Sequence, residues 1–307
     1  MAKDMVYVIG HKSPDTDTVC SAIAYAEYLK KNKVNAVAAV GGELNPETKF
    51  VLNYFKVAKP KKLESVGGKT LVLVDHNETG QMPEGADTAK IIEIIDHHKI
   101  SFVCNEPIKF RAEPVGSTAT IVAKIMLAGK FKITKQLAGI LVSAILSDTV
   151  VFKSATTTET DIKIAKQLAK IAKISNLKSF GIEIKKQKAS LKGLAVEQIL
   201  RSDYKEFESA QGKFAVGQIE VVDLAEAKSR AAEILQAMEA NNAKNNLTFT
   251  ALMITDIINC GSQLLVAGDP TLIEKAFNQH CTDNSMYLSN MMSRKKDLLP
   301  PLLKAIE

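Results

Sequence analysis

The chain has 307 residues, of which 46% are hydrophobic and 24% are charged, and its net charge is +6. This size and apolar content provide for two hydrophobic cores, and no low-complexity tract, repeat or membrane-length apolar run is present, which excludes a disordered, solenoid or membrane protein. The N-terminus carries no export signal and the four scattered cysteines form no C-x-x-C pair, so we expect a cytoplasmic protein with reduced thiols.

The first half of the chain alternates short β-rich runs with segments of helical periodicity. We expect strands at 5–9, 34–40, 70–74 and 90–95, and helices at 19–32 and after Pro46. This alternation is typical of βαβ units around a parallel sheet, that is, of an α/β fold. Further helices are expected at 116–127, 134–146, 159–172 and 177–191, the third of them capped by Thr157 or Thr158. The lysines of the last helix are predicted to form a solvated face.

A second, smaller α/β domain is predicted in the last third of the chain. We assign 1–188 to the first domain, 189–193 to a linker and 194–307 to the second domain. Strands are expected around Phe207 and at 214–222, 248–254 and 263–267, with helices at 224–240 and after Pro270. The basic run Arg294-Lys295-Lys296 near the end fits either a solvated charge run or an anion site.

The loop at 10–17 follows the first strand and reads Gly-His-Lys-Ser-Pro-Asp-Thr-Asp. Because Pro14 restricts the backbone, His11, Asp15 and Asp17 can converge on one short, stiff loop. Two aspartates at this spacing can serve two adjacent cations. The same residues also fit structural roles, Asp17 as the N-cap of the next helix and Asp15 as a turn residue.

Acidic and histidine residues follow two later strands as well. Asp75 and His76 close one strand, and Asp96, His97 and His98 close the next. Since ligands bind beyond the carboxyl ends of strands in an open α/β sheet, these side chains are expected at the same edge as the first loop. Adjacent histidines point to opposite sides of an extended backbone, so only one of this pair is expected to bind a metal.

Asp148 lies in Ser147-Asp148-Thr149, directly after an apolar helix, and by itself reads as a helix-terminal aspartate. Together with the upstream motifs it supplies a further carboxylate. The order G-H-K-S-P-D-T-D, D-H-N-E, D-H-H and S-D-T resembles the DHH phosphoesterase superfamily. The run Ser293-Arg294-Lys295-Lys296 resembles the basic motif of family II, manganese-dependent inorganic pyrophosphatases. The resemblance covers essentially the whole chain.

The resemblance implies a role for each of these positions. By similarity, one metal ion is bound by His11, Asp15 and Asp75, and a second by Asp17, Asp75, His97 and Asp148, with Asp75 as the bridge. It also implies a catalytic set of Asp15 and the pyrophosphate-contacting residues His98, Lys205, Arg294 and Lys295. Because the metal ligands lie in the first domain and most of the phosphate contacts in the second, the active site is expected in the cleft between them. A homodimer through the N-terminal domain is also implied.

The predicted reaction is the hydrolysis of inorganic pyrophosphate to two phosphates by water activated between two metal ions. Imidazole ligands favour a transition metal, so we expect two Mn²⁺ or Co²⁺ ions per subunit, with additional Mg²⁺ bound to the substrate. The alternatives are a short-chain exopolyphosphatase, a nucleotide phosphodiesterase of the same superfamily, and a non-enzymatic anion-binding regulator. The chain has no Trp and only 6% aromatic residues, so a base-stacking platform and a nucleic-acid partner are not expected.

Overall fold

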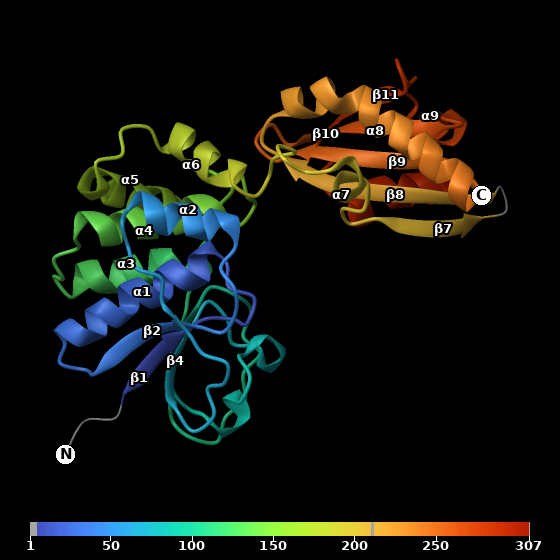
Figure 1. Cartoon of the computed structure of the whole chain (residues 1–307). Coiled ribbons are helices and arrows are strands. Elements are labelled where there is room, and N and C mark those ends of the chain that lie inside the picture. Colours follow the sequence, from blue (N-terminus) through green and yellow to red (C-terminus); the bar gives the residue numbers. More distant parts are fainter. Residues whose placement is uncertain (1–4, 210–211, 307) are drawn as a thin grey trace. The chain divides into compact units, whose positions relative to one another are not determined.

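The structure is a computed structural model that describes residues 5–209 and 212–306 of the chain. The chain forms two compact units, Met1–Lys188 and Ala189–Glu307 (Figure 1). Residues 189–193, expected to form a linker, pack against the second unit. The carbonyl of Ala189 accepts a hydrogen bond from the N–H of Val222 (3.1 Å), and Leu191 is buried in the core of that unit. Among the described residues, no helix has both the length and the apolar character needed to cross a membrane.

A parallel sheet forms the centre of the first unit. In the described part of this unit, six strands lie in the order β3-β2-β1-β4-β5-β6. They are β1 (Val6–Ile9), β2 (Ala36–Val40), β3 (Lys61–Lys62), β4 (Thr70–Val74), β5 (Lys90–Asp96) and β6 (Lys109–Ala112). The four predicted strands and the parallel α/β fold are confirmed. The edge strands β3 and β6 were not predicted, because their short, basic sequences lack an apolar alternation.

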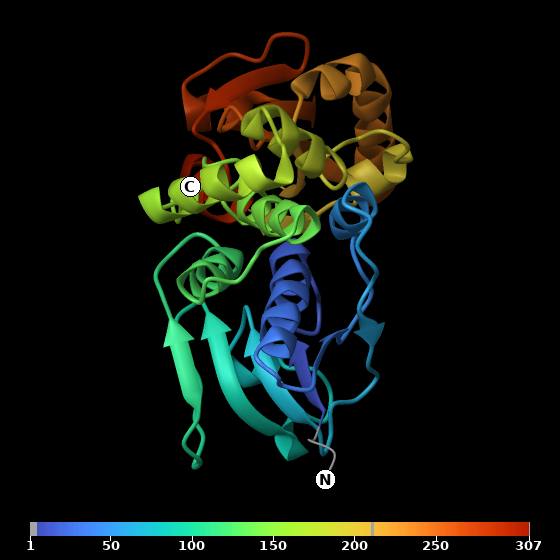
Figure 2. The ribbon, with the colours of Figure 1, turned by 90° about the vertical axis from the view of Figure 1, so that its left-hand side faces the viewer.

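Helices pack beside this sheet, as Figures 1 and 2 show. They are α1 (Thr16–Lys31), α2 (Pro46–Tyr54), α3 (Thr118–Ala128), α4 (Lys135–Asp148), α5 (Glu159–Ala172) and α6 (Leu177–Lys186). Helix α1 contacts β1 and β2 as well as α3 and α4, which explains why all of its first eleven residues are buried. Thr158, one of the two residues predicted to cap α5, is its N-cap and forms a capping box with Asp161.

The second unit is a smaller mixed α/β domain, as predicted. Its described strands lie in the order β11-β10-β9-β8-β7. They are β7 (Lys205–Ser209), β8 (Gly212–Val221), β9 (Leu247–Asp256), β10 (Gly261–Gly268) and β11 (Ser285–Ser289). Helix α8 (Leu224–Asn245) connects β8 to its parallel neighbour β9 and covers one face of the sheet, together with α7 (Val196–Leu200). The other face packs against α9 (Thr271–Phe277), η3 (Arg294–Leu298) and α10 (Leu299–Ile306). The basic run therefore belongs to η3.

The strand order of the first unit creates a topological switch point between β1 and β4. From β1 the chain continues to β2 on one side of this point, and from β4 it continues to β5 on the other side. Open α/β sheets bind ligands at such a point, beyond the carboxyl ends of the strands. His11 follows β1 and Asp75 follows β4, so both side chains lie at the switch point.

Candidate metal centre

Carboxylates and imidazoles from five segments of the first unit converge at this edge of the sheet. One group consists of His11, Asp15 and Asp75, and a second of Asp17, Asp75, His97 and Asp148; a third, overlapping arrangement joins Asp75 and His97 to His98. Within each group, one ligand-type atom from every residue lies within 4.8 Å of the others. Asp75 belongs to both groups, so a single carboxylate lies between two places that could each hold a metal ion. These groups match the two ligand sets implied by the sequence resemblance.

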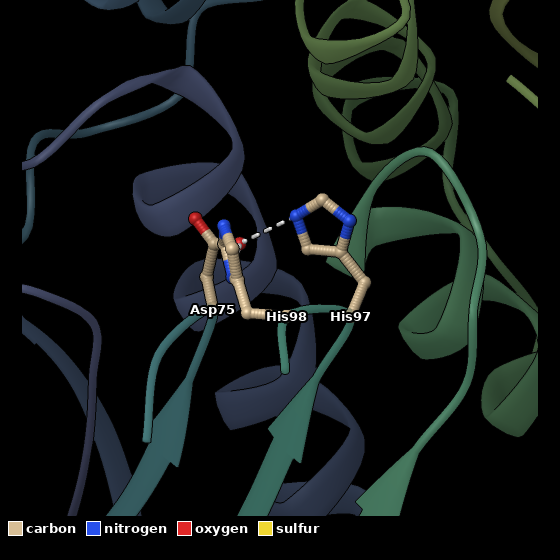
Figure 3. Close-up of side chains that lie close together, drawn as sticks. All are labelled: Asp75, His97 and His98. Atoms are coloured by element: carbon tan, nitrogen blue, oxygen red, sulfur yellow. Dashed lines mark ion pairs between the residues drawn. The ribbon is translucent and has the colours of Figure 1, made fainter. Parts of the chain in front are cut away.

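Asp75 is held in place by two threonine hydroxyls. It is 1% exposed and has a φ of 64°, a left-handed conformation that aspartate adopts more readily than most residues. Thr18 donates a hydrogen bond to Oδ2 (2.7 Å) and Thr118 donates one to Oδ1 (3.0 Å). On the metal side, Nε2 of His11 lies 3.7 Å from Oδ2, and Nε2 of His97 lies 3.4 Å from Oδ1 (Figure 3). The two threonines therefore fix the orientation of the carboxylate.

Asp15 and Asp17 occupy different positions from those expected on a single loop. Asp15 is the N-cap of α1 and accepts a hydrogen bond from the N–H of Thr18 (2.9 Å). Asp17 lies in the first turn of the helix, so its alternative role as N-cap is wrong. Its carboxylate accepts hydrogen bonds from the N–H groups of Thr118 (2.6 Å) and Ala119 (2.8 Å), at the positive end of α3.

His97 and His98 lie beside each other, contrary to the prediction that they face opposite sides. Their ring centroids are 4.2 Å apart (Figure 3). The chain bends directly after β5, because the Asp96 carboxylate accepts hydrogen bonds from the N–H groups of both His97 (2.8 Å) and His98 (3.2 Å). Alternation holds only for extended backbone, so it does not apply here. Nδ1 of His97 donates to the carbonyl of Val115 (2.9 Å), which turns Nε2 toward the carboxylates.

Asp96 orients His98 and belongs to none of the groups that share Asp75. It is fully buried and accepts hydrogen bonds from Nδ1 of His98 (2.9 Å) and from the Asn77 side chain (2.6 Å). The hydrogen bond to Asp96 raises the pKa of His98. Burial opposes ionisation of Asp96, but its hydrogen bonds from His98 and Asn77 outweigh that effect and lower its pKa. His98 is thus kept protonated on Nδ1, with Nε2 left for another partner.

The electrostatics of the cluster fit a bound cation. Burial and the charge of Asp75 raise the pKa of Asp17 to about 7, and burial with the charges of Asp17 and Asp15 raises that of Asp148. Burial lowers the pKa of His97, but the nearby carboxylate of Asp75 and the charge of Asp17 together raise it to about 9. Nε2 of His97 is buried without a hydrogen-bond partner. A divalent cation would neutralise the carboxylates and bind this nitrogen, so the donor set suits a transition metal.

Comparison with known proteins identifies the family. The DHH family N-terminal domain matches residues 5–145, and the DHHA2 domain matches residues 182–305. A manganese-dependent inorganic pyrophosphatase of Methanocaldococcus jannaschii is 44% identical over 98% of this chain and 99% of its own length. Another, from Methanothrix thermoacetophila, is 44% identical over 99% of both chains. The chain belongs to the manganese-dependent inorganic pyrophosphatase family.

A solved structure agrees with this family assignment. A crystal structure of a Methanococcus jannaschii protein, assigned to family II inorganic pyrophosphatases, matches 98% of this chain and 99% of its own. The TM-score is 0.66 and the sequence identity is 42%. The family resemblance read from the motifs is therefore confirmed, and so is the two-domain α/β fold class.

In this member of the pyrophosphatase family, Arg294 is a buried cation with unused donors. It is 6% exposed, and its Nη2 pairs with Asp203 (3.1 Å), whereas Nε and Nη1 are buried without a hydrogen-bond partner. Unpaired buried donors are costly, so this guanidinium is suited to receive an anion. The N–H of Arg294 donates to Gln218 of β8 (2.9 Å), which fixes the start of η3. Lys205 and Lys295, the other predicted contacts in this unit, have exposed side chains.

The lysines of α6 do not all face solvent, so that prediction is wrong for Lys185. Its side chain is 14% exposed and pairs with the buried Glu47 of α2 (3.2 Å). The helix also ends at Lys186 rather than at residue 191. The amphipathic pattern indicated a polar face but could not show that part of this face packs against another helix.

Several residues that orient this pyrophosphatase-family site were not identified from the sequence. Thr18, Asn77 and Thr118 donate hydrogen bonds to Asp75 or Asp96. Thr118 lies 43 positions from the aspartate it contacts, so no local spacing indicates the pairing. Asn77 had one available signal, because it directly follows the Asp-His pair at the end of β4.

Proposed function

We propose that this chain hydrolyses inorganic pyrophosphate to two phosphates with two Mn²⁺ ions held in its first unit. The observation that carries the proposal is that Asp75 belongs to both groups of metal-type residues. One carboxylate shared in this way sets a short separation between two cations, as in two-metal phosphoryl-transfer sites. The relatives at 44% identity, named manganese-dependent inorganic pyrophosphatases, support both the substrate and the metal.

Each residue has a part in this proposal. His11, Asp15 and Asp75 would hold one ion, and Asp17, Asp75, His97 and Asp148 the other. When bound, such cations supply Lewis acidity, which lowers the pKa of water and screens the charge of a phosphoryl group.

The remaining residues act on the anion. His98, oriented by Asp96, presents Nε2 to a phosphate oxygen. Arg294 offers two unpaired N–H donors in a planar fork, and Lys205 and Lys295 add positive charge. Together these groups stabilise the charge that develops on the leaving phosphate.

The proposal is tested by phosphate release from pyrophosphate, a short polyphosphate and a dinucleotide, after complete chelation and reconstitution with Mn²⁺, Co²⁺ or Mg²⁺. We expect pyrophosphate to be the preferred substrate. Mn²⁺ or Co²⁺ should support faster turnover than Mg²⁺ alone, because imidazole nitrogen is a better ligand for these metals. Preference for polyphosphate or for the dinucleotide would instead support the exopolyphosphatase or the phosphodiesterase alternative, and no hydrolysis at all would support a binding protein.

Metal binding should become weaker as the pH falls. In the metal-free protein the pKa of Asp17 is about 7 and that of His97 about 9, and both groups must lose their protons to bind a metal. Below pH 9 His97 is protonated, so Mn²⁺ affinity should fall by about tenfold per pH unit. Below pH 7 Asp17 is protonated too, and because the pKa of Asp148 is also raised, the slope should increase to about 100-fold per unit or more. Calorimetric titration in two buffers of different ionisation enthalpy measures the protons released, and binding without proton release would contradict this prediction.

The oligomeric state and location are also part of the proposal. We place the protein in the cytoplasm, where the free thiols Cys20, Cys104, Cys260 and Cys281 would remain reduced. We propose a homodimer through the first unit, where β6 lies at the edge of the sheet and the nearby Val103 is 92% exposed. Light scattering of the purified chain measures this state.

A further inference from the structure

A buried ion pair lies next to the metal centre without belonging to either group. Glu47, near the start of α2, and Lys185 of α6 are 3.2 Å apart, and their side chains are 3% and 14% exposed. A buried carboxylate is costly unless its oxygens are paired and hydrogen-bonded. The contacts of Glu47 therefore indicate what this pair does.

One carboxylate oxygen of Glu47 connects two helix ends that carry metal-type residues. Its Oε1 accepts hydrogen bonds from the hydroxyl of Thr16 (2.7 Å) and from the hydroxyl of Ser147. Thr16 lies between Asp15 and Asp17, at the start of α1. Ser147 directly precedes Asp148, at the end of α4. Glu47 thus ties together two segments that carry three of the carboxylates in the two groups.

Two further contacts fix helix α6 against the end of α4 and the residues that directly follow it. The ammonium group of Lys185 also lies 3.5 Å from the carbonyl oxygen of Ser147. Gly181 gives room for Val151, since a Cβ at this glycine would lie only 2.8 Å from a methyl carbon of that valine. The cation that balances Glu47 is therefore held by a packed helix rather than by a mobile side chain at the surface.

We propose that Glu47 and Lys185 are positioning residues that hold Asp15 and Asp17 at a fixed separation from Asp148, so that both groups can accept metal ions at once. This inference rests on the proposed function, because it assumes that the two groups bind metal. The crowded carboxylates repel one another unless a cation neutralises them, and a rigid tie between α1 and α4 opposes their separation. Residues that orient metal ligands contribute about 10–100-fold to metal affinity.

The test is a double-mutant cycle on Glu47 and Lys185. Binding is measured by Mn²⁺ titration and by the EPR signal of an exchange-coupled Mn²⁺ pair. Glu47→Gln and Lys185→Met each leave one buried charge without its partner, and each should weaken binding of the second Mn²⁺ by about 10–100-fold. The double variant should recover to within a few-fold of wild type, because the glutamine carbonyl still accepts from Thr16 and Ser147 and no buried charge is left unpaired. Glu47→Ala combined with Lys185→Met lacks an acceptor oxygen for Thr16 and Ser147, so its binding of the second Mn²⁺ should remain weak.

Glu93→Gln is the matched control. Glu93 is another buried carboxylate of the same unit, accepts a hydrogen bond from Tyr25 (2.7 Å) and pairs with Lys109 (2.5 Å). Its replacement should lower thermal stability without changing Mn²⁺ binding or the coupled EPR signal. If either single variant fails to fold, Ser147→Ala removes one tie without leaving a charge unpaired and should still weaken the second Mn²⁺ several-fold.

The proposal is overturned if the single variants bind two Mn²⁺ ions as wild type does, if Glu93→Gln has the same effect on binding, or if the double variant shows no recovery. Failure of the proposed function looks different. In that case wild-type protein would bind Mn²⁺, and the variants would differ from it in Mn²⁺ binding as described above. The wild-type protein would nevertheless release no phosphate from pyrophosphate.

Discussion

Replacing Asp75 with asparagine should abolish pyrophosphate hydrolysis, with a loss of turnover on the order of 10³-fold or more. The physical reason is that this carboxylate belongs to both groups, so its neutralisation weakens both metal positions and their fixed separation. The amide keeps the shape of the side chain but cannot provide two anionic oxygens. Folding should persist, because the Thr18 and Thr118 hydroxyls can still donate to the amide oxygen or accept from its nitrogen. Phosphate release and Mn²⁺ stoichiometry, measured on the same preparation, check this result.

Two single-group variants serve as controls for Asp75→Asn. His11→Gln affects only the group with Asp15, and Asp148→Ala affects only the group with Asp17 and His97. Each should weaken mainly one Mn²⁺ and leave the other measurable, whereas Asp75→Asn should weaken both. Loss of a single Mn²⁺ in Asp75→Asn would show that Asp75 is not shared, and the proposal that this carboxylate bridges the two ions would then be wrong.

Substituting Arg294 with lysine should raise KM and lower kcat together, and reduce kcat/KM by about 100-fold. Lysine keeps the charge but replaces a planar fork by a single ammonium group, so the two donors now buried and unpaired, Nε and Nη1, are lost. The pair with Asp203 fixes the guanidinium in the free protein, which means that the donors are oriented before the anion binds. Mn²⁺ affinity should not change, because the residue lies in the second unit.

Arg201→Lys is the matched control for this experiment. Arg201 belongs to the same unit and lies over the ring of Tyr204 (4.7 Å from its centroid). Its guanidinium also donates to Asn241, so its contacts differ from those of Arg294, whose Nε and Nη1 are buried and unpaired. Steady-state kinetics of both variants should show a defect only at Arg294. A normal KM in Arg294→Lys, or an equal defect in the control, would remove Arg294 from the set of phosphate contacts.

Much of this protein was predictable because the informative signals are local. The β-rich runs gave four strands of the parallel sheet, and the residues after β1, β4 and β5 carry the carboxylates and histidines. Since strand ends in a parallel sheet meet at one edge, position along the chain was enough to place these residues near one another. The family, too, could be read from the order of four short motifs, because each motif is contiguous in sequence.

The sequence by itself thus determined the α/β class, the family and the residues to examine, whereas the tertiary structure decided how those residues are held. Asp17 is bound by the N-terminus of α3, 101 positions away, and Glu47 meets Ser147 across 100 positions. His97 and His98 turn to the same side because Asp96 bends the chain. Periodicity and spacing report only on neighbours along the chain, while the orientation of a carboxylate depends on donors that folding brings from distant segments.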